Sequence, residues 1–343
     1  MRAHSESHRS QPALQRRGVM YLFAAMSGLL IVVLVLSLGM GAVDIPPGQV
    51  LGIVALKLLN APAIASAQAT IVWDFRLARA LLAISVGAGL AVAGAAYQAL
   101  FRNPLADPFI IGASGGASLG AVLAIITGVG PVMLLAFAGA VAAVILVYGI
   151  AESGNGQSST VHLLLAGAAL STLLSSMVSL LMFLHDRNVH EILAWLMGGL
   201  GGRSWTHLQS AAPIVLIGSV GLWALARPLD TLTCGEEAAQ SLGLDIRRAR
   251  IIIVGLAAFV TAAAVSTGGI IGFVGLLAPH MARLLVGGAH RRAIPASALF
   301  GGLLLLLADD LARTVAAPVE LPVGILMALL GAPFFLWLLK RRK

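Results

Sequence analysis

The chain has 343 residues, of which 59% are hydrophobic and only 10% are charged, with a mean hydropathy of +0.96. So few charged groups cannot cover a water-soluble body of this size, so the composition excludes a soluble protein and indicates one that crosses a membrane several times. The net charge of +8 does not indicate nucleic-acid binding, because Arg and Lys lie at the ends of apolar stretches and form no basic stripe. The single cysteine, Cys234, excludes an internal disulfide and a cysteine-rich metal site.

The first 18 residues are polar and rich in arginine, and we expect them to form a disordered cytoplasmic tail. The apolar stretch 19–42 follows. A secretory signal has an apolar core of about 7 to 15 residues, whereas this stretch matches the roughly 20 that a helix needs to cross a bilayer. We therefore predict that it is the first membrane span.

Ten apolar segments are long enough, or nearly long enough, to span a membrane. Together they predict an all-α polytopic membrane protein with about ten transmembrane helices, forming one domain over residues 19–340. The expected spans are 19–42, 79–101, 109–127, 131–150, 160–184, 208–226, 250–268, 272–287, 295–315 and 321–339.

The loops predict the orientation of these spans. If the N-terminus is cytoplasmic, 15 of the 22 Lys and Arg residues fall on the inner side and 6 on the outer side, with Arg283 inside a span. Basic residues favour cytoplasmic loops, so we expect a multi-pass protein with both termini in the cytoplasm.

Three connections are longer than a turn requires. The outer loop 43–75 contains an apolar helical patch. A second outer loop, 185–207, is expected to hold a re-entrant or interfacial helix at 189–197 and then a flexible, glycine-rich joint that reaches residue 202. The inner loop around 229–248 is the one sizeable soluble element.

A short polar turn follows the second span. Pro104 and Pro108 forbid a continuous helix, and each pushes the residue before it, Asn103 or Asp107, towards turn geometry. Next come glycines at every fourth position, which indicate close packing of the third helix against a neighbour. They are Gly112, Gly116 and Gly120.

The inner loop contains an acidic amphipathic helix. Glu236, Glu237, Gln240 and Asp245 are expected to face water. Cytoplasmic membrane surfaces are anionic and favour basic helices, so the acidic face favours a protein partner over the membrane surface, which stays the alternative. The residues expected to share the opposite, apolar side are Leu232, Ala238, Ala239, Leu242 and Ile246.

At this point the chain resembles a known family. The segment from Glu237 to Gly243 reads Glu-Ala-Ala-x-x-x-Gly, which is similar to the coupling-helix signature of ABC-transporter permeases. With its other motifs, the chain resembles the permeases of bacterial iron-siderophore, heme and vitamin B12 importers over about residues 20–340. The other motifs are Arg76-Leu-Ala-Arg79, Gly94-Ala-Ala-Tyr-Gln98, Arg102-Asn-Pro-Leu-Ala-Asp-Pro108, Trp195-Leu-Met-Gly198, Gly272-Phe-Val-Gly-Leu-Leu-Ala-Pro-His280 with Arg283, Ala308-Asp309 with Arg313, and Glu320-Leu-Pro-Val-Gly324 before Gly331-Ala-Pro333.

The resemblance implies the fold of a type II ABC importer permease in the bacterial inner membrane, and a transport subunit rather than an enzyme. It implies a homodimer with two ATP-binding-cassette ATPase subunits and a periplasmic or lipid-anchored substrate-binding protein. This chain is expected to bind no cofactor, ATP and Mg being used by the ATPase partner. The sequence agrees, because the nearest glycine-rich candidate for a phosphate loop, 198–204, has the wrong spacing.

The resemblance also implies roles for particular residues. ATPase coupling falls on Glu236, Glu237, Ala238, Ala239 and Gly243, and the turn Asn103, Pro104, Asp107, Pro108 lies on the same cytoplasmic face. The residues Arg76, Arg79 and Arg313 depart from the positive-inside rule, and the family implies that they dock glutamates of the binding protein. The alternative is snorkelling of arginines at helix ends. The family usually has proline where this chain has Ala78, which is expected to loosen the start of that helix.

The fifth helix carries a stripe of small hydroxyl residues at Ser171, Ser175 and Ser179. Two readings stay open: close helix packing, or a smooth wall of the translocation path. The family implies that the following segment, with Trp195, Gly198 and Gly199, is the outer gate.

The intramembrane carboxylates Asp309 and Asp310 are functional candidates by default. The first is expected to pair with Arg313, one turn further on, and the second has no assigned role. No pair among the eight histidines has a convincing metal-ligand spacing, so no metal site is predicted. Transient contact of His185 or His190 with heme stays open.

We therefore predict the permease subunit of an ATP-driven importer that moves a metal chelate into the cytoplasm, with an iron-siderophore as the leading substrate and heme or cobalamin as alternatives. An ion-coupled secondary transporter is the second hypothesis, but it requires matched broken helices and midplane ionisable groups, of which few are found. An intramembrane enzyme is the third, and a catalytic constellation is missing.

Overall fold

The computed structural model describes residues 7–41, 43–59, 66–153 and 160–341. Within them every regular element is helical, as predicted. The elements are α1 Ser7–Gly39, α2 Pro47–Leu58, α3 Ala67–Thr70, the π-helix η1 Ile71–Leu77, α4 Ala78–Leu100, α5 Ala113–Thr127, α6 Val132–Glu152, α7 Thr160–Leu184, the 3-10 turn η2 Asp186–Asn188, α8 Val189–Leu196, α9 Trp205–Ala224, α10 Ala226–Thr233, α11 Glu236–Ser241, α12 Ile246–Gly268, α13 Val274–Val286, α14 His290–Thr314 and α15 Val323–Arg341.

Each of the ten predicted spans coincides with one long helix or helical run. Seven of these are long and apolar enough to cross a membrane: α1, the run from α3 to α4, α6, α7, α9, α12 and α14. The other three, α5, α13 and α15, are shorter apolar helices at the predicted places. The helical patch expected in the loop 43–75 is α2, which begins with Pro47 at its first position, where a missing N–H costs nothing.

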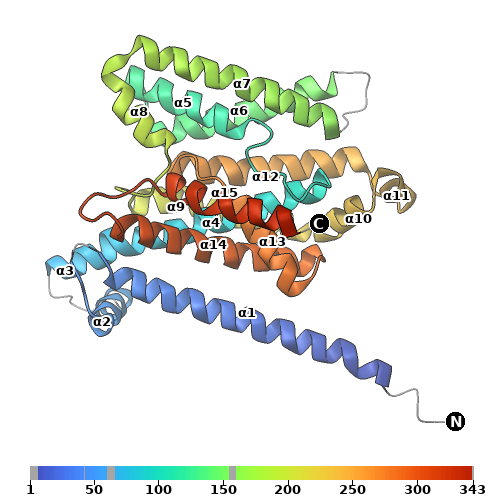
Figure 1. Cartoon of the computed structure of the whole chain (residues 1–343), viewed down its shortest axis with the longest axis horizontal. Helices are drawn as coiled ribbons and strands as arrows, with labels where there is room; N and C mark the ends of the chain where they lie inside the picture. The colour runs from blue at the N-terminus through green and yellow to red at the C-terminus, as the bar shows by residue number, and fades with distance from the viewer. Residues whose placement is uncertain (1–6, 42, 60–65, 154–159, 342–343) are drawn as a thin grey trace.

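The helix α4 lies at the centre of the bundle. It contacts α9, α12, α13 and α14, while α5, α6 and α7 form a separate layer on one side and α1 lies along the opposite side (Figure 1). In an apolar 18-residue stretch of the span Ala67–Leu100, 78% of the residues are buried within the chain, against 6% in the corresponding stretch of Gly18–Gly39. The exposed face of α1 is therefore apolar surface for lipid, whereas α4 is core.

Glycine pairs let the central helices approach one another closely. A Cβ at Gly94 of α4 would lie 2.1 Å from the carbonyl oxygen of Gly275 in α13, and one at Gly87 would lie 2.2 Å from that of Gly301 in α14. Neither space holds even a methyl group. Membrane helices associate largely by such backbone approach, so these crossings fix the position of α4.

The predicted glycine stripe on α5 is confirmed at two of its three positions. A Cβ at Gly116 or Gly120 would lie about 2 Å from backbone oxygens of α6. The third position, Gly112, is different: a Cβ there would make only ordinary contacts, but its φ of +87° lies in the left-handed region. Its glycine is therefore required by the turn that starts α5 and not by packing.

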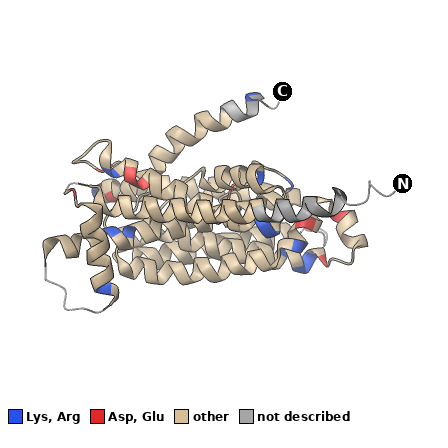
Figure 2. Ribbon diagram, turned by 90° about the horizontal axis from the view of Figure 1, so that it is seen from below, with Lys and Arg blue, Asp and Glu red and all other residues tan. Residues whose placement is uncertain are grey.

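Charged residues gather at the two ends of the bundle, with an uncharged middle between them (Figure 2). One end carries the start of α4, the end of α14 and Glu320; we call it the Glu320 end. The other carries α10 and α11 and is called the Glu237 end. The first turns of α1 and the last turns of α15 both lie towards the Glu237 end (Figure 1), which agrees with an even number of spans.

Two local predictions are wrong. The predicted disordered tail reaches residue 18, but α1 begins at Ser7, and residues 1–6 lie outside the described part. The segment Ala13–Arg17 consists of good helix formers, so a helix already nucleated in the membrane extends through them. Nor does Ala78 loosen the start of α4: unlike proline, alanine keeps its N–H, and the chain stays helical from Ala67 to Leu100.

Candidate functional site

The inner loop forms two short helices, α10 and α11, which together cover one corner of the Glu237 end. Ala239 is fully buried, while Glu237, Gln240 and Asp245 face solvent as predicted. Leu232 and Ile246 are buried as well, whereas Ala238 is half-buried. The acidic face of α11 is therefore open at this end of the molecule.

One residue of the predicted apolar side is placed wrongly. Leu242 is 73% exposed, because Gly243 takes a left-handed conformation with φ of +82° and ends α11. The Leu244 N–H then donates to the Ala239 carbonyl at 3.0 Å, which closes the helix end and turns Leu244 inward instead. The Glu-Ala-Ala-x-x-x-Gly pattern thus codes a short helix with a sharp stop and an outward leucine.

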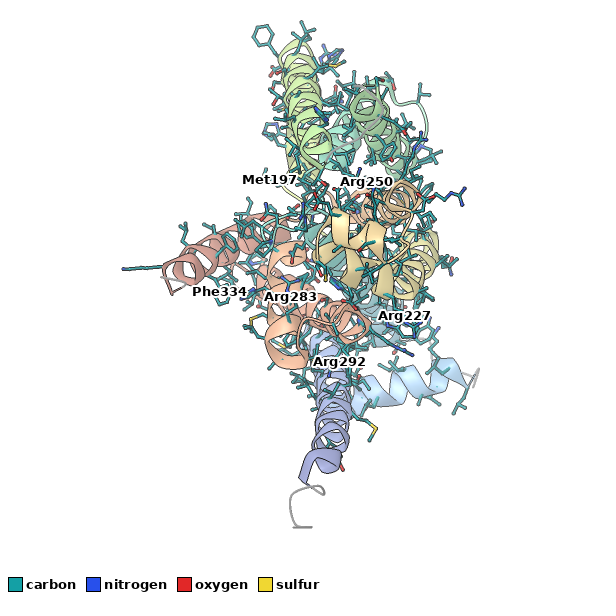
Figure 3. The ribbon with its side chains drawn as sticks, turned by 90° about the vertical axis from the view of Figure 1, so that its right-hand side faces the viewer. Met197, Arg227, Arg250, Arg283, Arg292 and Phe334 are labelled. Atoms are coloured by element: carbon teal, nitrogen blue, oxygen red, sulfur yellow. The ribbon has the colours of Figure 1, made fainter. Side chains whose placement is uncertain are left out.

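The side chain of Glu236 ties α11 to two other helices. Its carboxylate accepts a hydrogen bond from Arg250 Nη2 of α12 at 2.8 Å and one from the Thr160 hydroxyl of α7 at 3.3 Å. Arg250, labelled in Figure 3, is only 5% exposed, whereas the Glu236 side chain is 42% exposed, so the pair is shielded from water on the arginine side alone. The Glu236 carboxylate therefore joins α11 both to α12 and to the first turn of α7.

The preceding helix α10 is held to α14 by a second polar contact. The Asp230 carboxylate accepts the backbone N–H of His290 at 2.9 Å, and its Oδ1 lies 2.6 Å from His290 Nδ1. His290 starts α14 and is 5% exposed. Each of the two short helices is thus attached to the bundle by a polar side-chain contact.

The predicted turn after α4 lies at the same end. Asn103 Oδ1 accepts the Leu105 N–H and Asp107 Oδ1 accepts the Phe109 N–H, both at 2.9 Å, which makes two successive Asx turns. Arg102 lines a pocket of about 510 Å³ with Glu236 and Glu237. The turn therefore lies beside the start of α11, as the sequence indicated.

Two of the three serines in the α7 stripe do not serve packing within this chain. Ser175 and Ser179 are exposed, and Ser171 is half-buried next to α5. With two neighbouring hydroxyl residues they line a groove of about 520 Å³. The packing contacts of α7 come from another face, formed by Leu163, Gly167, Leu174 and Val178.

At the Glu320 end, the arginine at position 76 caps a neighbouring helix. Its guanidinium donates to the carbonyls of Leu38 at 2.9 Å, Gly39 at 3.0 Å and Val43 at 2.6 Å. The last carbonyls of α1 have no partner within their own helix, so Arg76 satisfies them. It is 9% exposed.

The second arginine of the predicted docking set forms a buried ion pair. Arg79 Nε lies 2.9 Å from Asp309 Oδ2, and Nη1 lies 2.8 Å from Glu320 Oε2. Asp309 is 1% exposed. The predicted partner of Asp309, Arg313, lies further away, with Nε at 3.6 Å from Oδ2.

The third arginine supplies a role for Asp310. Arg313 pairs with Asp310, and the Ser37 hydroxyl donates to the same carboxylate oxygen at 2.6 Å. Asp310 therefore joins α14 to the end of α1. A serine 273 positions away in the sequence carried no signal of this contact.

All three arginines of the predicted docking set, Arg76, Arg79 and Arg313, are thus held by partners within the chain, either carboxylates or helix carbonyls. Their docking role requires these internal partners to be exchanged, and it stays a prediction.

The segment expected to form a gate begins with the helix α8, as the sequence predicted. The joint that follows is held by backbone hydrogen bonds: Gly199 N–H donates to the Gly268 carbonyl at 2.8 Å, and Gly324 N–H donates to the Gly198 carbonyl at 3.2 Å. A flexible joint was expected. Instead, it is attached to the end of α12 and the start of α15, and Trp195 packs above it as a buried side chain.

Metal-ligating side chains do not cluster in the described ranges, where no group of three His, Cys, Asp or Glu residues could hold an ion. His185 and His190 both lie at the Glu320 end, and His185 Nδ1 lies 3.0 Å from the Leu181 carbonyl. The structure therefore brings together two kinds of feature: ion pairs that join helices, and an acidic helix that faces solvent. Such an arrangement is suited to transmitting motion.

Comparison with known proteins agrees with this geometry. The model of the FecCD transport family matches residues 29–341. The cobalamin import system permease protein BtuC of Halobacterium salinarum is 48% identical over 279 residues, which cover 80% of this chain and 74% of the relative. The hemin transport system permease protein HmuU of Yersinia pestis is 40% identical, covering 79% and 84%. The Fe(3+) dicitrate transport system permease protein FecD of Escherichia coli is 42% identical, covering 80% and 86%.

A solved structure, described as an inward-facing conformation of a metal-chelate type ABC transporter, aligns with a TM-score of 0.82 and 32% identity over 94% of this chain and 99% of that one. Fold and site together define a polytopic helical permease subunit of an ABC importer for metal chelates, which leaves ATP hydrolysis to a separate subunit. The chain belongs to the FecCD transport family.

Proposed function

We propose that this chain is the membrane subunit of an importer that moves an iron chelate into the cytoplasm, driven by ATP hydrolysis in two partner subunits. The observation that carries the proposal is the attachment of α11 through Glu236 to Arg250 of α12 and Thr160 of α7. An exposed acidic helix can bind the ATPase subunits. Because it also contacts α7, which carries the polar groove, it can pass their movement on to the translocation path.

In this mechanism the ATPase pair binds α11 at the Glu237 end, which is then the cytoplasmic end. Closure of the pair displaces α11, and the Glu236 contacts carry the displacement into the first turn of α7. The hydroxyl stripe of that helix, Ser171, Ser175 and Ser179, would line the path and present small side chains that do not trap a bulky chelate.

The permease would act as a homodimer with the path along its two-fold axis. One feature supports this. The stripe face of α7 is exposed at the edge of the bundle. Residues of this kind are covered in an assembly rather than left to lipid, because a polar groove is poorly matched to acyl chains.

At the opposite, outer end, a substrate-binding protein would deliver the chelate. Its carboxylates would dock by exchanging with the internal partners of Arg79, of which Glu320 is the more accessible, with a side chain 49% exposed. Opening of the gate at Trp195, Gly198 and Gly199 requires the two backbone hydrogen bonds of the joint to break.

The test is uptake by the purified complex in liposomes. With candidate ATPase and binding-protein subunits present, a radiolabelled iron chelate should accumulate only when ATP and Mg are supplied on the ATPase side. Transport by this chain alone, driven by an ion gradient and indifferent to ATP, would instead establish the secondary-transporter alternative. Heme and cobalamin serve as competing substrates in the same assay, because the relatives named for them are as similar to this chain as the iron permease is.

A further inference from the structure

A cavity of about 470 Å³ lies at the Glu320 end, directly beside the gate segment. Its wall includes Trp195, the backbone of 198–201, two arginines and two glutamates. The volume lies within the range of about 300 to 1,000 Å³ that is common for small-molecule sites. Its charged members are Arg79, Arg203, Glu191 and Glu320.

These four charges are not balanced in pairs. Arg79 is neutralised by Asp309 and Glu320. Glu191 is exposed on the first turn of α8. Arg203, which is half-buried in the joint before α9, has no carboxylate within ion-pair distance among the residues that the structure describes; its one polar neighbour there is His207, whose Nε2 lies 3.3 Å from Nη1.

Two buried donors in this wall lack acceptors. Arg203 Nε and Trp195 Nε1 are both shielded from solvent and make no hydrogen bond within the described part of the chain. The side chain of Trp195 as a whole is 9% exposed. A buried donor without an acceptor is unfavourable, and more so when the group is charged, so a water or a ligand that enters the cavity would complete these two donors.

The charge of Arg203 favours an anion as that ligand. Burial lowers its pKa, yet arginine stays protonated in proteins, so the site keeps a cation that is only partly solvated. The first turn of α9 begins directly after Ser204, and its partial positive charge adds to that of the guanidinium. A carboxylate would be attracted by both the guanidinium and the start of α9, and the arginine fork matches carboxylate geometry.

We propose that this cavity is a binding site for carboxylate groups of the transported chelate, with Arg203 as its anchoring cation, and that it favours anionic chelates over neutral ones. This proposal rests on the proposed function. It commits to a small ligand rather than to a carboxylate of the binding protein, because Arg203 is half-buried in the wall of a concave cavity whose volume suits a small molecule.

The first experiment uses citrate itself as the probe and needs no transport. The purified permease in nanodiscs is heated with sodium citrate, or with sodium chloride at the same ionic strength. Citrate should raise the melting temperature of the natural chain by several degrees, because a ligand of the folded state stabilises it. Arg203→Gln should abolish this shift and Arg203→Lys should keep part of it, while Arg187→Gln, which changes an exposed arginine of the same outer region, should leave it unchanged.

Without citrate, Arg203→Gln should melt at or above the temperature of the natural chain, since a buried cation without a counter-ion is removed. A lower melting temperature would show that Arg203 has a structural partner and would overturn the proposal. So would an equal citrate shift in the natural chain and in Arg203→Gln, or no citrate shift in either.

The second experiment distinguishes whether the carboxylate belongs to the chelate or to the binding protein. In reconstituted uptake, Arg203→Gln should reduce transport of ferric citrate at least tenfold relative to cyanocobalamin, which carries no net charge, with chelate-free docking of the binding protein unchanged. A fall in docking with no change in chelate preference would assign the site to the binding protein and overturn the proposal. Absence of ATP-driven uptake of any chelate by the natural chain would refute the proposed function instead, and the citrate shift would still report on the site.

Discussion

A single buried carboxylate, Asp309, holds the ends of two central helices together. It is 1% exposed and pairs with Arg79 through two nitrogens, while Arg313 lies close to it as well. The sequence pointed to Asp309 and to Arg313 one turn away, because that spacing is visible in a helix. It could not point to Arg79, which is 230 positions away and is brought in only by the crossing of α4 and α14.

We predict that Asp309→Asn destabilises the protein by about 3 kcal/mol, because it removes the buried counter-ion of Arg79 and leaves that cation only the half-exposed Glu320 as a partner. The measurement is thermal unfolding in detergent. Combining it with Arg79→Gln should restore part of the loss, since the double variant has no stranded charge. A double variant that melts at the sum of both single losses would show that the pair does not couple.

The turn carboxylate Asp107 predicts a dependence of stability on pH. Burial raises its pKa to about 6, with the Phe109 N–H opposing the shift. The folded protein therefore binds this proton more tightly than the unfolded chain does, so the contribution of Asp107 to the free energy of unfolding falls as pH rises from about 4 to 6 and is constant above that.

We predict that Asp107→Asn removes this fall and raises stability above pH 6 by on the order of 1 kcal/mol, a fraction of the full shift, because the residue is only half-buried and water still reaches it. The amide oxygen of asparagine can still accept the Phe109 N–H, so the turn is kept. The check is melting temperature against pH in both proteins. Parallel curves between pH 4 and 7 would rule out the assigned titration.

At the scale of elements, hydropathy predicted where the long helices lie, but it did not predict the short elements and the contacts that connect them. The ten apolar segments each became a helix, because length and apolarity decide membrane crossing. The π-helix η1, the backbone bonds of the gate joint and the two-helix form of the inner loop depend on contacts between distant segments, which leave no period in the sequence. The family motifs identified residues at several of these contacts without revealing their partners.

The crossing of α4 and α13 predicts that alanine is harmful at Gly94, inside the crossing, but tolerated at Gly255, outside it. Gly94→Ala should lower stability by about 2 kcal/mol or prevent assembly of the bundle, because its Cβ would lie 2.1 Å from the Gly275 oxygen. The control is Gly255→Ala on α12, where a Cβ meets nothing within 4 Å. There alanine should be neutral or stabilise by up to about 1 kcal/mol, as a better helix former. Equal melting temperatures for the two variants would argue against a close crossing.

The exposed end of α11 predicts where an ATPase subunit binds. Glu237 lies on the open acidic face, and Leu242, which follows the last residue of α11, is 73% exposed. We predict that Glu237→Lys lowers ATPase binding at least tenfold while the melting temperature of the permease alone stays unchanged, since the side chain contributes nothing to the core.

The matched control for that variant is Asp186→Lys, which makes the same charge change at an exposed site of the Glu320 end. Binding and stimulation of the ATPase should be normal in this control. If Glu237→Lys also binds and stimulates normally, the assignment of α11 to coupling is wrong.

At the scale of the whole molecule, the two ends differ in how their charged groups are arranged. At the Glu237 end, the acidic helix α11 is open to a partner while Glu236 holds it to α7 and α12. At the Glu320 end, arginines are buried with internal carboxylates and the gate joint is locked by backbone bonds. The joint at the Glu320 end is therefore held in place in this conformation, and under the proposed function we expect work done at the other end to pass through α7 and α12, the helices that Glu236 contacts.

In the membrane, the exposed groove of α7 is covered either by lipid or by a second copy of the chain, and cross-linking distinguishes the two. A two-fold axis beside α7 would bring a residue of the stripe next to the same residue of the partner copy. In a background with Cys234→Ser, which removes the one native thiol, Ser175→Cys and Ser179→Cys should each form a disulfide-linked dimer under mild oxidation. Leu216→Cys on α9, exposed but far from the stripe, should stay monomeric on the same gel. Cross-linking through α9 and not through α7 would place the axis elsewhere and remove the stripe from the translocation path.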